Sequence, residues 1–426
     1  MIKYLELKNV GPAPEMSLDF EKRLNLITGD NGLGKSFILD IAWWSMTRKW
    51  PNEANPRLTT GKKAIPSGSG EASISFAFTG KAKLENYLST YQRKEQSWTG
   101  RAGRPANPGL VLYAMSDGSF GVWDPARNYW KTQEGVDIQE RPPAYVFSPT
   151  EIWDGLPEGG TASLCNGLIR DWASWQKEKG NAFKHLKQVL KNLSPSHEEK
   201  IEPGSLTRIS LDDVRDMPTI KAPYEKEIPI VHASSGIKRI VAMAYLLVWS
   251  WEEHQRAAKL LGDQPTKQIV FLIDELESHL HPSWQRKIMP SLLEVMKGLS
   301  KKTQVQLVTA THSPLIMASA EPLFDSSQDA WFDLDLEDGE VVSRKREFIR
   351  RGDVKNWLTS EAFDLKSTYS LEAEQVLEKA TETLSNESLD ANSAKQLDAD
   401  LRKVLSDTDP FWMRWRFVAE KKGWLQ

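Results

Sequence analysis

The segment from Gly29 to Ser36 has the composition and spacing of a loop that binds phosphate groups. Its glycines allow backbone N–H groups to turn inward around phosphates, and the start of a following helix adds partial positive charge. The lysine would reach the β- and γ-phosphates, and the serine would ligate Mg²⁺. The segment therefore predicts a site for ATP and Mg²⁺ built by Gly29, Asp30, Asn31, Gly32, Leu33, Gly34, Lys35 and Ser36.

Two adjacent carboxylates, Asp274 and Glu275, follow the apolar run 269–273. Such a run is typical of a strand buried on both faces, and its C-terminal edge would face the phosphate loop. We expect Asp274 to hold Mg²⁺, directly or through water, and Glu275 to polarise the attacking water. Two acids after a strand are more often the cap of a helix, but the phosphate loop upstream favours the catalytic interpretation.

The residues around this acid pair resemble the Walker B and D-loop stretch of RecF- and OLD-type ATPases, which are ABC-type and SMC-like. The similarity rests on Leu272-Ile273-Asp274-Glu275 followed by Glu277, His279, Leu280, His281 and Pro282. The resemblance implies that two heads sandwich two ATP molecules, with the phosphate loop of one subunit facing the signature sequence of the other. We therefore expect a homodimer or higher oligomer held together through shared ATP sites.

The segment 234–239 resembles the ABC signature sequence, although Ile237 stands where a second glycine is common and Lys238 where glutamine is common. A serine at a helix N-cap and free N–H groups in the first turn form an anion site. The resemblance implies that Ser235 and Gly236 contact the γ-phosphate held by a second subunit. In isolation the same residues would simply cap a helix.

The segment 309–314, at the end of another apolar strand, resembles the switch-histidine segment of ABC ATPases. The resemblance implies that His312 contacts the γ-phosphate and senses its loss. The stretch 144–151 resembles the region where other ABC proteins carry the Q-loop glutamine, but no glutamine is present. Either Ser148 or Glu151 substitutes for it, or the stretch is an ordinary strand ended by proline.

The runs 120–130, 145–156 and 164–175 look like those of the ATPase subunits of Septu and retron anti-phage systems. That resemblance implies a regulatory ATPase that controls a partner effector, an HNH-type nuclease. The alternative is a RecF-like DNA repair or recombination ATPase, with DNA or RNA as a partner. A transporter subunit fits less well, because a fuller signature and a shorter C-terminal extension would be expected.

The elements that must position these residues can be read from hydrophobic periodicity and turn signals. Strands are predicted at 2–10, 15–20, 23–28, 74–78, 110–115, 120–123, 144–147, 269–273 and 305–310, with a hairpin of 331–336 and 341–346. Helices are predicted at 36–50, 163–179, 183–193 and after residue 233, and 52–70 is predicted to be an exposed loop. No sustained heptad pattern predicts a coiled-coil arm.

These elements predict an α/β fold: an ABC-type ATPase head with a mixed β-sheet lobe, an α+β insertion lobe and a helical C-terminal region. The head would comprise 1–51, with the phosphate loop, and 231–350, with the signature, Walker B and switch histidine. Residues 52–230 would form the insertion lobe, and 351–426 the helical region.

Composition excludes several other classes of protein. A net charge of -3, from 55 basic and 58 acidic residues, gives no overall field toward nucleic acid or anionic lipid. The single cysteine excludes an internal disulfide framework, and no apolar stretch is long enough to span a membrane. We expect a cytoplasmic protein without a membrane segment.

Two further clusters admit different interpretations. Asp333, Asp335 and Asp338 suggest a metal loop, but alternation with apolar residues favours the solvent-facing side of a hairpin. The segment 409–415 contains three aromatic residues beside arginines, which favours either a protein-binding surface or a helix packed on its own domain. Most of the 17 tryptophans are predicted to lie in the core.

Overall fold

The computed structural model describes residues 1–80, 83–100, 106–129, 131–132, 139–140, 144–157, 163–196, 198–221, 226–299, 303–385 and 391–424. The chain divides into two compact units, Met1–Trp357 (unit 1) and Leu358–Gln426 (unit 2). All of the predicted site residues lie in unit 1, and each unit has its own hydrophobic core.

Unit 1 is built on an eight-stranded mixed sheet in the order β11-β8-β7-β17-β18-β3-β19-β20. Its strands are β3 Leu24–Gly29, β7 Leu110–Ala114, β8 Phe120–Trp123, β11 Tyr145–Phe147, β17 Gln268–Ile273, β18 Gln304–Ala310, β19 Asp329–Glu337 and β20 Glu340–Arg346. Strands β7, β17, β18, β3 and β19 run parallel to one another. Their carboxyl ends therefore share one edge, where the phosphate loop, Asp274 and the segment before His312 meet.

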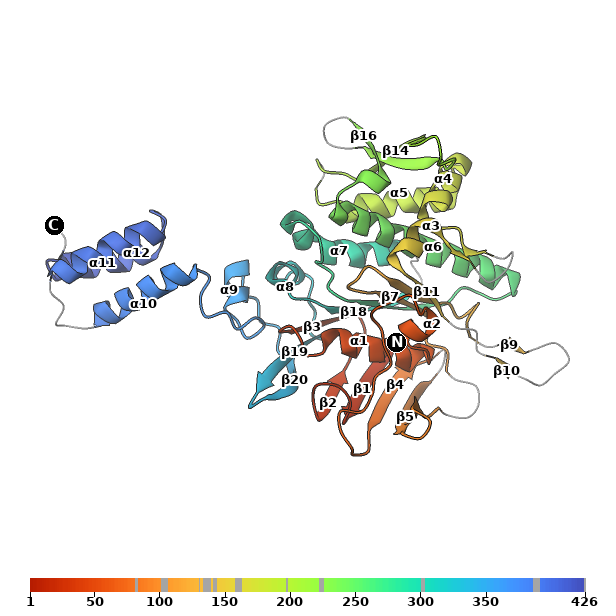
Figure 1. Cartoon of the computed structure of the whole chain (residues 1–426), viewed down its shortest axis with the longest axis horizontal. Helices are drawn as coiled ribbons and strands as arrows, with labels where there is room; N and C mark the ends of the chain where they lie inside the picture. Colours follow the sequence, from red (N-terminus) through yellow and green to blue (C-terminus); the bar gives the residue numbers. More distant parts are fainter. Residues whose placement is uncertain are drawn as a thin grey trace. The chain divides into compact units, whose positions relative to one another are not determined.

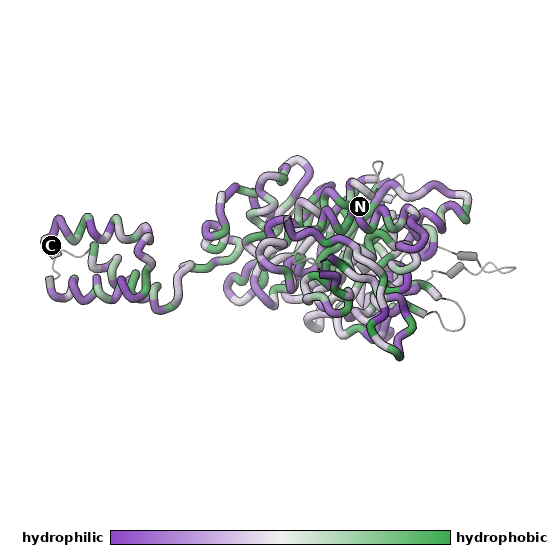
Figure 2. Tube along the Cα trace, turned by 90° about the horizontal axis from the view of Figure 1, so that it is seen from above, coloured by the Kyte–Doolittle hydropathy of each residue, from purple (hydrophilic) through white to green (hydrophobic). Residues whose placement is uncertain are grey.

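A second, antiparallel sheet has the order β2-β1-β4-β5-β6. It consists of β1 Ile2–Lys8, β2 Glu15–Asp19, β4 Ser73–Thr79, β5 Leu84–Gln92 and β6 Ser97–Trp98. Helix α1, Lys35–Thr47, lies between the two sheets (Figure 1), and residues of all three layers form one core cluster. Figure 2 shows hydrophobic segments running through the middle of unit 1.

The opposite face of the large sheet carries the helices α6 Ser235–Leu260 and α7 Pro282–Leu299 (Figure 1). A further layer beyond them contains α4 Leu168–Glu178, α5 Asn181–Leu193, β14 Glu202–Thr207, β15 Met217–Lys221 and β16 Glu227–Pro229. The remaining elements are α2 Pro51–Ala54, α3 Pro149–Asp154, α8 Pro314–Ala320, α9 Val354–Leu358, β9 Lys131–Thr132, β10 Gln139–Glu140, β12 Leu156–Pro157, β13 Ser163–Cys165 and the 3₁₀ turn Ile230–His232. Within the described ranges, no helix is both long and apolar enough to cross a bilayer.

The segment 52–230 is divided between these layers. Strands β4, β5, β7, β8 and β11 belong to the two sheets of the head, whereas α4, α5 and β14–β16 form the outer layer. Periodicity identified β7, β8 and β11 as strands, but it could not show that β7 pairs with β17, which lies more than a hundred residues downstream. The insertion lobe predicted for 52–230 therefore includes strands that belong to the central sheet.

Several predicted boundaries were wrong. The helix expected at 36–50 ends at Thr47, and Pro51 begins the short helix α2, because proline fits the first turn of a helix. The expected exposed loop 52–70 buries Leu58 and Ala64 against the core. The helix expected at 163–179 begins only at Leu168, after strand β13.

The hairpin of β19 and β20 is confirmed, but the interpretation of its acids was partly wrong. Asp333 is buried, accepts a hydrogen bond from Thr28 Oγ1 at 2.9 Å and pairs with Arg346. Leu336, expected on the inner face, is instead exposed. Burial of Asp333 is tolerated because both partners satisfy its carboxylate.

Unit 2 consists of helices α10 Leu371–Ser385, α11 Ala391–Val404 and α12 Phe411–Lys421. Trp412 and Trp415 are buried in its core with Leu401, and Trp415 Nε1 donates to Asp398 Oδ1 at 2.9 Å. Two of the three aromatic residues in 409–415 therefore hold this unit together and are not a protein-binding surface. Most described tryptophans of unit 1 are also buried, as predicted, whereas Trp130 lies outside the described residues.

Candidate functional site

The predicted phosphate loop connects β3 to α1 at the carboxyl edge of the large sheet. Gly29, Gly32 and Gly34 all have positive φ, of 134°, 85° and 96°. Gly34 is the N-cap of α1 in the left-handed region, and an added Cβ would lie 2.8 Å from Pro12 Cγ. A side chain at that position would be both strained and obstructed, so the loop requires glycine there. The start of α1 thus presents its backbone N–H groups from a tight turn.

Lys35 is the buried cation of this loop. Its Nζ donates to the carbonyl oxygens of Gly29, at 2.6 Å, and Asp30, at 2.7 Å. Burial lowers the pKa of Lys35 to about 8, although the nearby acids, led by Asp274, act in the opposite direction. A cation with so little water around it interacts strongly with any anion that approaches the loop.

Asp274 follows β17, and its backbone N–H donates to Ala114 O at 2.8 Å. Its side chain is buried, and burial raises its pKa. Its Oδ1 atom has no hydrogen-bond partner among the described residues. Together with Ser36, Asp274 lines a pocket of about 710 Å³ beside α1.

This donor set fits Mg²⁺. The ion takes one or two protein oxygens and completes its octahedral shell with water and phosphate oxygens. Ser36 and Asp274 supply a hydroxyl and a carboxylate in the same pocket, and the buried Oδ1 of Asp274 is an unused acceptor. Burial of an unpaired carboxylate oxygen is costly, and a bound cation would offset that cost.

Glu275 lies next to Asp274 but has different surroundings. Its backbone adopts the left-handed region with φ of 49°, which is uncommon for a residue with a side chain. The side chain is 38% exposed, and Oε2 accepts a hydrogen bond from Ser278 Oγ at 2.9 Å. Oε1 lies 3.9 Å from Nε2 of His312. Glu275 is thus accessible to water and held beside the predicted switch histidine.

His312 follows β18 and lies close to Glu275. Burial together with the charge of Lys35 lowers the pKa of its ring. Its backbone N–H donates to Glu277 Oε1 at 2.5 Å, and Thr311 Oγ1 donates to Glu277 Oε2 at 2.8 Å. Glu277 thereby ties the end of β18 to the loop after β17, and its own pKa is raised by burial.

The structure therefore brings Lys35, Ser36, Asp274, Glu275 and His312 together at one edge of the sheet. Ser235 and Gly236 do not line the same pocket. The N-cap of α6 is Ser234, whose hydroxyl accepts from the Ile237 N–H at 3.4 Å. Ser235 is the first helical residue and is exposed.

Gly236 is buried under the loop that follows β17. An added Cβ would lie 2.7 Å from the carbonyl oxygen of His279. The first turn of α6 therefore packs directly on the backbone of the predicted D-loop. This contact explains the glycine by packing alone, independently of any contact with phosphate.

We predict that Gly236→Ala destabilises the protein by roughly 1–3 kcal/mol, because the methyl group forces α6 away from His279. Gly298→Ala in α7 is the matched control, since nothing lies within 4 Å of its added Cβ. That substitution should be neutral or stabilising by up to about 1 kcal/mol, because alanine favours helix. Thermal unfolding of both variants measures the difference, and equal stability would contradict the close packing of Gly236.

Arg239 is the last residue of the signature-like segment 234–239 and lies on the second turn of α6. Its guanidinium donates to the carbonyl oxygens of Met115, Ser116, Asp274 and Glu275 at 3.0–3.4 Å. It therefore connects α6 to the ends of both β7 and β17. The sequence alone could not identify these acceptors, because every residue has a backbone carbonyl group.

The region of the missing Q-loop glutamine is a helix cap. Ser148 and Glu151 form a reciprocal capping box at the start of α3. Glu151 also accepts from Asn55 Nδ2 at 2.6 Å and pairs with Arg57. These contacts favour the structural interpretation of this stretch over a role at the phosphates.

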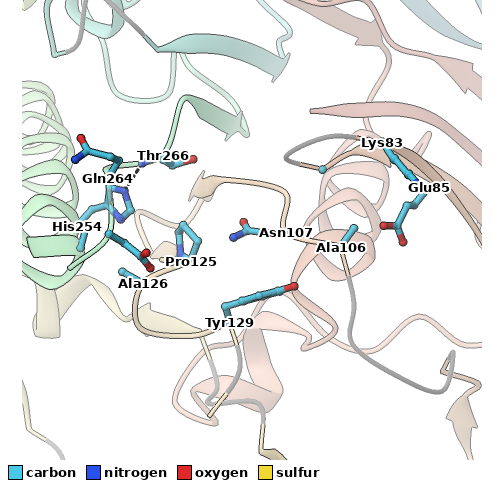
Figure 3. A pocket seen from close by; sticks show the side chains of 13 residues that line it. Lys83, Glu85, Ala106, Asn107, Pro125, Ala126, Tyr129, His254, Gln264 and Thr266 are labelled. Carbon is cyan, nitrogen blue, oxygen red and sulfur yellow. Dashed lines mark hydrogen bonds between the residues drawn. The ribbon is translucent and has the colours of Figure 1, made fainter. Parts of the chain in front are cut away.

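A different pocket, of about 450 Å³, is lined by His254 and Tyr129 among others (Figure 3). His254 is already satisfied at both nitrogens. Nδ1 lies 2.7 Å from Asp124 Oδ1, and Nε2 accepts from the Thr266 N–H at 2.8 Å. The histidine therefore holds β17 and α6 in place and is not free to act as a general base.

The chain is similar to several known proteins. Residues 24–318 match the family described as "AAA domain, putative AbiEii toxin, Type IV TA system". The Septu protein PtuA of Bacillus thuringiensis is 24% identical over 326 residues, covering 75% of this chain and 74% of PtuA. The retron Ec83 probable ATPase of Escherichia coli is 25% identical over 160 residues, 36% of this chain and 26% of that protein. A solved SmcHead bound to the C-winged helix domain of ScpA is 14% identical, with a TM-score of 0.46, over 81% of this chain and 98% of its own.

Proposed function

The chain belongs to the AAA-domain family whose model covers residues 24–318, and we propose that it is the regulatory ATPase subunit of an anti-phage defence complex. Membership of this family makes it an ATPase of the AAA/ABC type. Its similarity to PtuA and to retron ATPases supports the defence setting. The finer elements of the proposal are ATP-dependent dimerisation and control of an HNH-type nuclease.

One observation carries the ATPase proposal: a loop that can bind phosphates, a buried unpaired carboxylate oxygen and an accessible glutamate lie at the same sheet edge. The loop supplies Lys35 and the N-terminus of α1, and Ser36 shares its pocket with Asp274. Glu275 lies beside them but remains exposed enough to contact water. This arrangement supplies charge neutralisation, metal ligands and a base, which are the groups that phosphoryl transfer requires.

Each residue then has a distinct role in hydrolysis. Mg²⁺, when bound, would neutralise charge on the β- and γ-phosphates, with Ser36 and Asp274 as its protein ligands. Lys35 supplies a fixed cation inside the loop. Glu275 accepts the proton of the attacking water, and His312 lies beside it, where its ring can hydrogen-bond the γ-phosphate.

The position of the signature-like segment supports a site shared between two copies. Ser235 is exposed at the start of α6 and lies outside the pocket that contains Ser36 and Asp274. Its N-terminal N–H groups can bind an anion that is presented by another molecule. We therefore place the γ-phosphate of one subunit against Ser235 and Gly236 of a second copy, so that ATP joins the two.

The surface of unit 2 supports docking of a separate effector. Met413 and Phe417 lie one turn apart on α12 and are 77% and 69% exposed. Arg414 and Arg416 are exposed beside them. Large apolar side chains flanked by arginine are typical of protein interfaces, so the partner surface should be apolar with an acidic rim.

We expect the double substitution Met413→Asp and Phe417→Asp to weaken capture of a co-expressed HNH nuclease by at least about tenfold while leaving ATP turnover unchanged. Leu211→Asp, which alters a fully exposed leucine in unit 1, is the control and should not affect capture. Co-purification and phosphate release are measured on the same preparations. Nuclease capture by the double variant at the wild-type level would refute docking at α12.

A further inference from the structure

A hydrogen-bonded pair, Asp40 and Tyr113, lines the pocket that contains Ser36 and Asp274. Asp40 lies on α1, and Tyr113 lies on β7. Tyr113 is buried, and its hydroxyl donates to Asp40 Oδ1 at 2.9 Å. Neither residue belongs to a motif that predicts the ATP site. The pair therefore places a second carboxylate in the pocket and fixes its orientation.

The spacing along α1 determines what this carboxylate can reach. Asp40 follows Ser36 by four residues, so both side chains lie on one face of the helix, about 6 Å apart along its axis. This spacing allows both side chains to reach the same ion or its water shell, because residues at i and i+4 on one helix face can converge on a single metal. It suits a carboxylate that accepts a hydrogen bond from water in the ion's shell.

The composition of the pocket agrees with this arrangement. Mg²⁺ loses its waters reluctantly and is held by few protein ligands, which leaves several waters to be oriented by surrounding groups. Across the described ranges, no three acidic, histidine or cysteine side chains are grouped closely enough to hold a metal by themselves. The waters around a metal at Ser36 and Asp274 would thus need acceptors, and Asp40 lines the same pocket.

We propose that Asp40 is a positioning residue that accepts a hydrogen bond from a water bound to Mg²⁺, with Tyr113 orienting its carboxylate. This inference rests on the proposed ATP site. Because Tyr113 donates to Oδ1, Oδ2 remains as an acceptor for the water. Burial raises the pKa of Asp40 to about 7, so a divalent cation nearby favours the charged carboxylate, and that charge in turn increases the affinity of the site for the cation.

The competing explanation is that the pair only ties α1 to β7. The two roles depend on different properties of the side chains. Asparagine can still accept the hydrogen bond from Tyr113 but carries no charge, so Asp40→Asn retains the tie and removes the charge. Tyr113→Phe removes the tie and retains the charge. A second buried pair, Tyr245 and Asp171, has the same chemistry, with a bond of 2.7 Å, away from this pocket.

The test uses the full chain with a slowly hydrolysed ATP analogue and Mn²⁺ as a spectroscopic probe of the metal site. Electron paramagnetic resonance titration should show that Asp40→Asn weakens Mn²⁺ binding by roughly 10-fold or more. Tyr113→Phe should cause a smaller loss, and Asp171→Asn none. Nucleotide affinity in the presence of a chelator should be the same for Asp40→Asn and the wild type, since no metal is bound.

Wild-type Mn²⁺ affinity in Asp40→Asn would overturn the proposal and leave the pair as a structural tie. An equal loss of nucleotide affinity with and without metal, together with a lower unfolding temperature, would also overturn it. Failure of the wild-type chain to bind nucleotide is a different result, because it would overturn the ATP site itself and, with it, the role of Asp40.

Discussion

Lys35→Ala is expected to reduce ATP affinity by at least about 100-fold. The contacts of the ammonium group with the β- and γ-phosphates would be lost, and each charge-assisted contact is worth about 1.5–3 kcal/mol. The remaining loop cannot compensate, since Lys35 is its only buried cation among the described residues and its Nζ lies against the loop carbonyls. Glu275→Gln should behave differently. It keeps the size and the hydrogen-bonding capacity of the side chain, so ATP should still bind.

Hydrolysis by Glu275→Gln should fall by about 10²- to 10⁴-fold, the usual contribution of a general base. Fluorescence titration measures binding, and phosphate release measures turnover. Glu340→Gln, at the exposed start of β20, is the control and should match the wild type in both. Parental turnover by Glu275→Gln would exclude Glu275 as the residue that activates water.

The motifs could be predicted from sequence because each combines residue type, spacing and a local element. The phosphate loop lies between a strand and a helix, and Asp274 follows a strand of five buried residues. These patterns are local, so a single sequence is sufficient to identify them. Parallel pairing then explains why the segments meet, since β3, β17 and β18 end at the same edge.

The residues that connect the motifs could not be predicted in the same way. Arg239 binds carbonyl groups that lie 35 and more than 120 positions away, and Tyr113 meets Asp40 across 73 positions. Such contacts depend on strand order, which hydrophobic periodicity does not contain. Glu277 illustrates the same limit, because its partners Thr311 and His312 become neighbours only when β17 and β18 pair.

Tertiary packing also overrides local rules. Prolines at 203, 218 and 229 lie in β14, β15 and β16, a small antiparallel sheet with a register shift between Pro203 and Leu206. Proline is tolerated at such edges and irregularities. For the aromatic residues near the C-terminus, the interpretation as a helix packed on its own domain holds for Trp412 and Trp415, because a small three-helix unit needs large side chains for its core.

The second large effect concerns the sharing of ATP sites between two copies. Lys35→Ala subunits should lack a working phosphate loop but keep the signature-like helix start. Ser235→Arg subunits should keep a working phosphate loop, because Ser235 does not line the pocket that contains Ser36 and Asp274. The arginine should block the anion site at the start of α6. Each variant alone should be inactive, since both of its composite sites carry one defect.

A mixed dimer distributes these defects unequally. In one site the altered loop faces the altered helix start, whereas in the other both contributing surfaces are wild type. With independent sites and random pairing, equal amounts of the two variants should recover roughly a quarter of wild-type turnover. A complete site within one copy predicts no recovery, because every subunit would remain defective.

ATP turnover by the mixture of Lys35→Ala and Ser235→Arg chains therefore tests the shared site most directly. Native mass spectrometry of differently tagged chains must first show that the two variants form mixed dimers in the presence of ATP. Recovery of activity in those samples, with each variant inactive alone, is the predicted result. A mixture that contains mixed dimers but remains as inactive as its components would contradict the shared ATP site.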